Sequence, residues 1–187
     1  MNDMVAVAPR EIRDYVYRAT RLTGVDHGVA DEIARAAVFA HVQLDSHLAN
    51  VLDALERGEN PMFGLPFVAE AIRVSGQTVA APDGLVVADL ALYAWEACER
   101  GTQVHLTCKD GERRSPNEWM SVGRAPLGVS KLDVVVEEPN RSGLARAVTR
   151  RRQAFEVGAR IDQGAWTRLV ALAAEYLVSE SEIDALG

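Results

Sequence analysis

Hydrophobic residues recur at helical spacing along the first part of the chain. Residues 9–24 form one such segment, which Pro9 is suited to begin and Gly24 is suited to end. Residues 26–44 form a second segment, with one stripe of valine, isoleucine and alanine side chains. The pattern therefore predicts two consecutive amphipathic helices.

A third helix is predicted where a short polar stretch gives way to leucines. Asp45 or Ser46 is suited to cap its N-terminus, because either side chain can accept a hydrogen bond from a free backbone N–H group. Gly58 and Pro61 are suited to end it. Its expected buried face consists of Leu48, Val51, Leu52 and Leu55.

The centre of the chain alternates between strand patterns and turns. We expect a hairpin of two short strands over residues 71–84 and further strands over 102–108 and 131–139. Helical spacing returns over residues 85–101, and residues 109–119 form a polar turn region. A strand-rich centre with one helix is the expected result.

The last predicted element is an amphipathic helix over residues 161–179, with Asp162 as its cap. The class is therefore α+β, with an N-terminal three-helix unit, a central mixed layer of strands and helix, and a C-terminal helix. We expect a single domain over residues 1–187, with a helical part over 1–61 and an α+β part over 62–187.

Composition excludes several classes of protein. Hydrophobic residues make up 48% of 187 residues, enough for a core, and the net charge of -7 argues against a role in binding nucleic acid. Cys98 and Cys108 give neither a disulfide framework nor a metal-binding spacing. No signal peptide and no membrane-spanning run are visible, so we expect a cytoplasmic chain without membrane contact.

Three motifs follow one another in a fixed order. Asp45-Ser46-His47 heads the third predicted helix, residues 57–61 read RGENP, and residues 78–106 run through a helix and a glycine into a strand. This series resembles the N-terminal part of the type-2 malate/L-lactate dehydrogenase family. The resemblance implies a substrate site beside the serine and the histidine.

A second resemblance rests on residues 84–89, Gly-Leu-Val-Val-Ala-Asp, and on the pattern Asp162, Trp166, Leu169, Leu172 and Ala173. Residues 84–89 match, with one shift in the pattern, the Gly-x-x-Leu-x-Asp motif of a small bacterial family that is classified as a domain of unknown function. The second set matches that family's motif Asp-x-x-x-Trp-x-x-Leu-x-x-Leu-Ala. The chain is similar to that family in length. Its last residues, YLVSESEIDALG, depart from the family's Val-Pro and Gly/Ala-rich tail.

The chemistry of the dehydrogenases is not expected here. The resemblance requires an arginine four residues after His47 to clamp the substrate carboxylate, and Val51 stands there. It also requires a catalytic histidine near residues 110–113, which read Asp-Gly-Glu-Arg. The remaining chain is too short for the family's nucleotide-binding portion. We therefore expect no hydride transfer, no cofactor and no binding of NAD or NADP.

Two groups of residues are candidates for chemistry. Ser46 and His47 form a proton-transfer pair with the carboxylate of Asp89, or else Ser46 caps the helix and His47 is an ordinary first-turn residue. His41 and His47 lack the i,i+4 spacing of a zinc pair, so no metal is expected. The candidate residues for binding a substrate carboxylate are Arg113, Arg114, Arg150 and His105.

Two functions remain open. The first is a cofactor-free enzyme of a bacterial biosynthetic pathway, a lyase, isomerase or hydrolase that transfers a proton on a small carboxylated metabolite. The alternative is a non-catalytic binding or stabilising subunit of a larger metabolic enzyme. In either case we expect a homodimer or a hetero-complex, since residues 166–178 offer an apolar helical face.

The two interpretations of Ser46 and His47 predict opposite rankings of two variants. If the stretch only starts a helix, Ser46→Ala costs about 1 kcal/mol of stability and His47→Ala a few tenths. If a site survives, His47→Ala abolishes ligand binding and leaves folding intact. Chemical denaturation and a binding assay on both variants separate these outcomes.

Overall fold

The computed structural model describes residues 3–44, 47–59, 69–70, 78–80, 87–101, 103–108, 113–115, 129–135 and 142–184. Helices lie towards both ends of the chain and most strands lie in the centre, which confirms the α+β class. The elements, in chain order, are β1 (Met4–Val7), α1 (Pro9–Arg21), α2 (His27–Leu44), α3 (His47–Glu56), β2 (Thr78–Ala80), α5 (Val87–Glu99), β3 (Gln103–Cys108), β4 (Arg113–Arg114), β5 (Val129–Val135), α7 (Ser142–Val157), β6 (Ala159–Asp162) and α8 (Gln163–Asp184).

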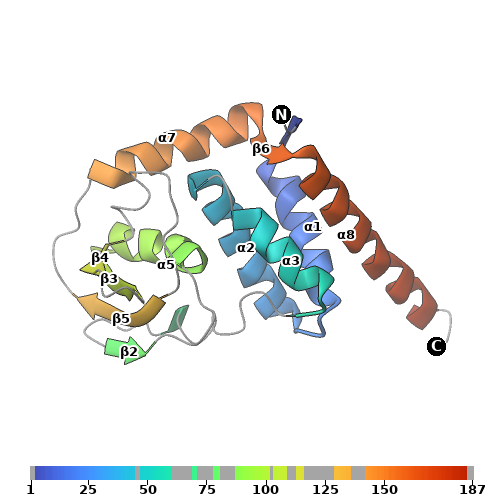
Figure 1. The fold of residues 1–187 in the computed structure, drawn as a ribbon, viewed down its shortest axis with the longest axis horizontal. Coiled ribbons are helices and arrows are strands. Elements are labelled where there is room, and N and C mark those ends of the chain that lie inside the picture. The colour runs from blue at the N-terminus through green and yellow to red at the C-terminus, as the bar shows by residue number, and fades with distance from the viewer. Residues whose placement is uncertain are drawn as a thin grey trace.

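The three predicted N-terminal helices are present, and α2 lies at their centre. It packs against α1, α3, α5 and α7, while α8 packs along α1 and α3 (Figure 1). Asp26 caps α2 by accepting a hydrogen bond from the N–H of Val29 at 2.9 Å. The predicted buried face of α3 is confirmed, since all four of its leucine and valine residues are buried: Leu48, Val51, Leu52 and Leu55.

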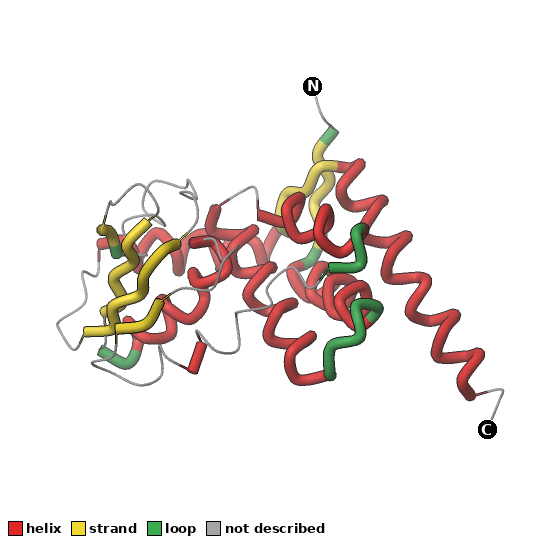
Figure 2. The backbone as a smooth tube through the Cα atoms, turned by 60° about the horizontal axis from the view of Figure 1, so that its bottom comes forward, coloured by secondary structure: helices red, strands yellow, loops and turns green. Residues whose placement is uncertain are grey.

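A four-stranded antiparallel sheet lies at the opposite end of the molecule from α8 (Figure 2). Its strand order is β2-β5-β3-β4, and α5 packs against β3. The predicted strands over 102–108 and 131–139 correspond to β3 and β5. The expected polar turn region is wrong in one respect, because Arg113 and Arg114 form β4 and pair with Thr107 and Leu106.

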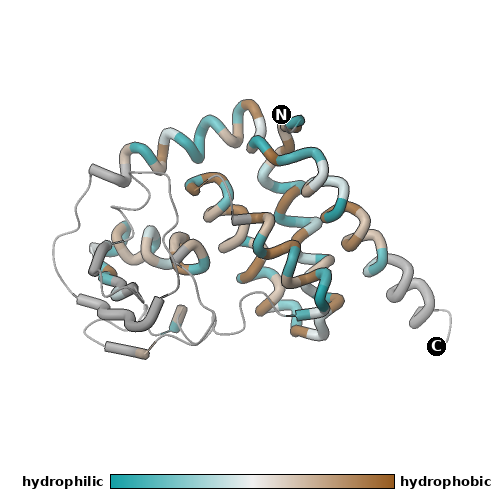
Figure 3. Tube along the Cα trace, viewed as in Figure 1, coloured by the Kyte–Doolittle hydropathy of each residue, from teal (hydrophilic) through white to brown (hydrophobic). Residues whose placement is uncertain are grey.

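Two other features were not predicted. The strands β1 and β6 form a separate antiparallel pair, with Val5 opposite Ile161. The long helix α7 directly precedes β6, and its buried positions among the described side chains are Ala147 and Ala154. Figure 3 shows hydrophilic residues along much of α7, whereas α2 is largely hydrophobic. Where the buried side chains of a helix are small alanines, as along the described part of α7, the hydrophobic pattern is weak, which explains the omission.

The predicted cap of the C-terminal helix is confirmed. Oδ1 of Asp162 accepts a hydrogen bond from the N–H of Ala165 at 3.0 Å, at the start of α8. No helix in the described part of the chain combines the length and the apolar character needed to cross a membrane.

Arg168 on α8 ties that helix to α3 by surface ion pairs. Its Nε lies 2.6 Å from a carboxylate oxygen of Glu56, and one of its terminal nitrogens lies 2.7 Å from Oδ1 of Asp53. Hydrogen bonding to Arg168 lowers the pKa of Glu56 from its usual value of 4.5, and the same contacts raise the pKa of Arg168.

The lowered pKa of Glu56 makes its contribution to stability depend on pH. The stabilisation is complete above the unfolded-state pKa of 4.5 and is lost as the pH falls through the lower folded-state value. Glu56→Gln should therefore destabilise the protein at pH 7 and have a smaller effect at pH 3. Thermal unfolding at both pH values measures this. Glu175→Gln, an exposed change on α8, serves as the control. A loss of stability that does not depend on pH would contradict the prediction.

Gly158 joins α7 to β6 with a positive φ of 88°. A Cβ at this position would lie 3.1 Å from the backbone N of Val7 and 3.2 Å from Ala6, so it would press against β1. Gly24 has a similar φ of 80°, but a Cβ there would meet nothing within 4 Å. The two positions differ in the space around the added atom rather than in backbone strain.

Gly24→Ala should cost about 1 kcal/mol of unfolding free energy, from the left-handed backbone alone. Gly158→Ala should cost about 2 kcal/mol or more, because steric pressure on β1 adds to the same strain. Urea denaturation of both variants provides the comparison. Equal losses would mean that β1 moves aside without cost.

Candidate functional site

The structure places the predicted catalytic residues only in part. Asp45 and Ser46 lie outside the described residues, and His47 begins α3 with its side chain also outside them. Asp89 lies in the first turn of α5 with 2% of its surface exposed. The catalytic role of Ser46, His47 and Asp89 therefore stays a prediction.

The predicted substrate-binding residues are spread over three elements. His105 is half-buried on β3, directly across the sheet from Asp133 on β5. Arg113 and Arg114 form β4, and their side chains lie outside the described residues. Arg150 lies on α7. The four residues therefore belong to β3, β4 and α7.

Arg150 supports the end of α2. One of its terminal nitrogens donates a hydrogen bond to the backbone carbonyl of Gln43, in the last turn of that helix. Such carbonyls lack partners within their own helix, so the arginine satisfies one of them. Arg150 also lines a small pocket of about 270 Å³ together with His41 and Arg160. Nε2 of the buried His41 faces the carbonyl of Arg160 at 3.0 Å, so this nitrogen carries the proton.

A larger pocket, of about 380 Å³, lies between α1, α2, α5 and α7. We call it the interhelical pocket. Four arginines contribute to its lining, and the one carboxylate among its lining residues is Glu96. The arginines come from three helices: Arg10 and Arg13 from α1, Arg35 from α2 and Arg151 from α7.

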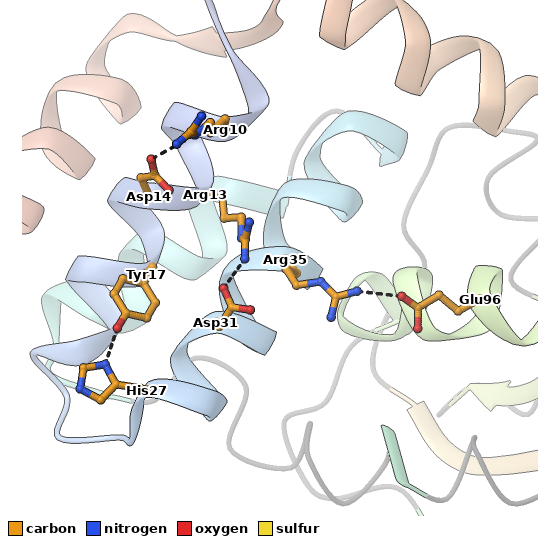
Figure 4. A network of polar contacts seen from close by, with 8 residues as sticks. All are labelled: Arg10, Arg13, Asp14, Tyr17, His27, Asp31, Arg35 and Glu96. Carbon is orange, nitrogen blue, oxygen red and sulfur yellow. Dashed lines mark hydrogen bonds and ion pairs between the residues drawn. The ribbon is translucent and has the colours of Figure 1, made fainter.

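Three of these arginines are held by carboxylates (Figure 4). Arg13 lies 2.5 Å from Oδ1 of Asp31, which joins α1 to α2. Arg35 lies 2.9 Å from Oε1 of Glu96, which joins α2 to α5. Arg10 has a longer contact of 4.0 Å with Asp14 on its own helix. These pairs fix the guanidinium groups in place, and each pair leaves further N–H donors unused.

Arg151 is held differently. Its guanidinium carbon lies 5.2 Å from the ring centroid of Trp95 and 5.9 Å from that of Phe155. Trp95 is in turn stacked on Phe39, with centroids 5.3 Å apart and planes inclined at 29°. No ion pair to a carboxylate is found for Arg151 among the described residues. It therefore differs from the other three arginines of this pocket, each of which contacts a carboxylate.

Two buried polar atoms lie among the residues of the pocket lining. Nε1 of Trp95 and Oε1 of Gln43 have no hydrogen-bond partner within the described part of the structure. The other end of the Gln43 amide donates to the carbonyl of Ala147 at 3.0 Å, which ties α2 to α7. A buried polar atom without a partner costs stability, so evolution tends to keep such atoms where they serve a purpose.

The described lining holds few groups that could transfer a proton. It contains no histidine, cysteine, serine, threonine or tyrosine among the described residues, and Glu96 is engaged by Arg35. No group of three or more potential metal ligands is found in the described parts of the chain. An apolar floor with guanidinium groups at its edge can hold an anion that has an apolar body.

Sequence reasoning missed most of this pocket. Arg151 directly follows Arg150 in a run of three arginines, and the sequence suggested Arg150 rather than Arg151 as the binding residue. The three arginines from α1 and α2 read as ordinary surface positions of amphipathic helices. Only the spacing of these arginines along their helices could indicate a shared site, and it does so only when the packing of α7 on α2 is known.

No family model, no curated protein and no solved structure matches this chain.

Proposed function

We propose that this protein binds a small carboxylated metabolite in the interhelical pocket. The observation that carries the proposal is the guanidinium of Arg151, which lines the pocket and has no ion pair among the described residues, whereas the other three arginines of the lining each contact a carboxylate. A guanidinium near apolar surface, without a carboxylate beside it, lacks a counter-charge. A bound anion would supply that counter-charge.

A carboxylate suits the lining because a guanidinium donates two parallel N–H bonds to it. Arg151 would be the principal anchor, since it contacts ring faces and its N–H edges stay available. Arg13 and Arg35 would add long-range attraction, weakened by the carboxylates that they already contact.

The same geometry favours the non-catalytic interpretation over the enzyme. A lyase, isomerase or hydrolase needs a group that gains or loses a proton beside the substrate. The described lining offers only Glu96 for this role, and its carboxylate is engaged by Arg35 at 2.9 Å. We therefore propose a binding module, acting as a subunit of a homodimer or of a larger metabolic complex.

The proposal predicts a large difference between two neighbouring arginines. Arg151→Gln should weaken the binding of phenylacetate and hexanoate about tenfold or more, because a charged hydrogen bond is lost. Arg152→Gln removes the same charge from a position outside the pocket lining, where it contacts Glu156 at 3.6 Å, and should have little effect. Isothermal titration calorimetry measures both variants.

Neutral amides provide the second comparison. Phenylacetamide and hexanamide should bind at least about tenfold more weakly than the acids, since they lack the charge that Arg151 recognises. Amides that bind as tightly as acids, or equal losses in the two arginine variants, would rule out an anion site at this pocket.

A further inference from the structure

A series of stacked groups runs along one side of the interhelical pocket. In order, they are the ring of Phe39 on α2, the ring of Trp95 on α5, the guanidinium of Arg151 on α7, and the ring of Phe155 one turn further along α7. We call this the aromatic–arginine stack. Three helices contribute to it, so it forms only when the fold is complete.

Phe155 is the unusual member of the stack. With 64% of its surface exposed, it is a large aromatic side chain left largely in solvent, although it lines the pocket. Its one described ring contact is with Arg151. The exposed ring therefore offers apolar surface that a ligand in this pocket can cover.

The stack also orients the anion site. The guanidinium carbon of Arg151 lies over the rings of Trp95 and Phe155, and cation–π contact with ring faces leaves the N–H groups available as donors. A carboxylate bound to those N–H groups lies beside the rings rather than above the charge. The remainder of the ligand then lies against Trp95 and Phe155, next to the aliphatic lining residues Val38, Val42 and Leu92.

We infer that the carboxylated metabolite carries a planar aromatic ring, which extends the aromatic–arginine stack. This inference rests on the proposed function and specifies the ligand class of that same pocket. A saturated ring would bury a similar apolar area but would gain nothing from ring stacking. An aromatic ring adds an interaction that corresponds to roughly a twofold to tenfold gain in affinity.

Four probes of similar size test the inference on the unaltered protein by isothermal titration calorimetry. They are phenylacetate, its saturated counterpart cyclohexylacetate, the neutral phenylacetamide, and phenyl phosphate. Phenylacetate should bind about fivefold tighter than cyclohexylacetate and should also exceed the other two. Tighter binding of phenyl phosphate than of phenylacetate would overturn the assignment to a carboxylate.

Substitutions of Phe155 give an independent readout, because an exposed side chain can be changed without loss of the fold. Phe155→Leu should remove the preference for phenylacetate over cyclohexylacetate, and Phe155→Tyr should retain it. Val148→Ala, on the same helix and outside the lining, is the matched control and should leave the preference unchanged.

The possible failures are distinguishable. Equal affinities of the unaltered protein for phenylacetate and cyclohexylacetate would overturn the aromatic class while leaving the carboxylate site in place. If Phe155→Leu still prefers phenylacetate over cyclohexylacetate, the aromatic–arginine stack is not the cause of that preference. Absence of binding by every carboxylate at millimolar concentration would overturn both the inference and the proposed function.

Discussion

The close packing of α2 is the constraint on which the rest of the structure depends. Four other helices contact this helix, and alanine occupies many of its buried positions. Small side chains let the helix axes approach closely, so the surrounding helices are fixed by contact with one central element. The helices α1, α5 and α7 each pack against α2, and the interhelical pocket is the space that remains between them. Longer side chains from all four helices line this space.

Polar contacts then select one arrangement among those that this packing allows. Arg35 reaches Glu96 on α5, and the amide of Gln43 reaches the backbone of α7. Exposed ion pairs contribute little free energy individually. A buried amide is different, because its hydrogen bond is made only in the correct register of the two helices. Gln43 therefore specifies how α7 lies on α2, and through α7 it positions Arg151.

The sequence predicted the elements whose hydrophobic pattern is strong. The buried leucines of α3, the β-branched run of β5 and the capping role of Asp162 were all visible locally, and the structure confirms them. It did not predict α7, whose buried alanines are indistinguishable from surface alanines in a local pattern. The pocket was beyond prediction for a related reason. Arg13, Arg35 and Arg151 are far apart in the chain, and only tertiary packing shows that they face one space.

The pairing of β1 with β6 has a consequence for the order in which the protein folds. Val7 pairs with Ala159, and the carbonyl of Asp3 accepts a hydrogen bond from Gln163 at 2.8 Å, so the first strand cannot find its partner until nearly all of the chain is available. Contacts this distant in sequence form slowly, because closing a long loop costs conformational entropy before the new contacts stabilise the chain. Since α7 directly precedes β6, closure of this loop also delivers Arg151 to the pocket. A chain that ends before β6 would therefore hold β1 without its partner strand, so this strand pair is completed at a late stage of folding.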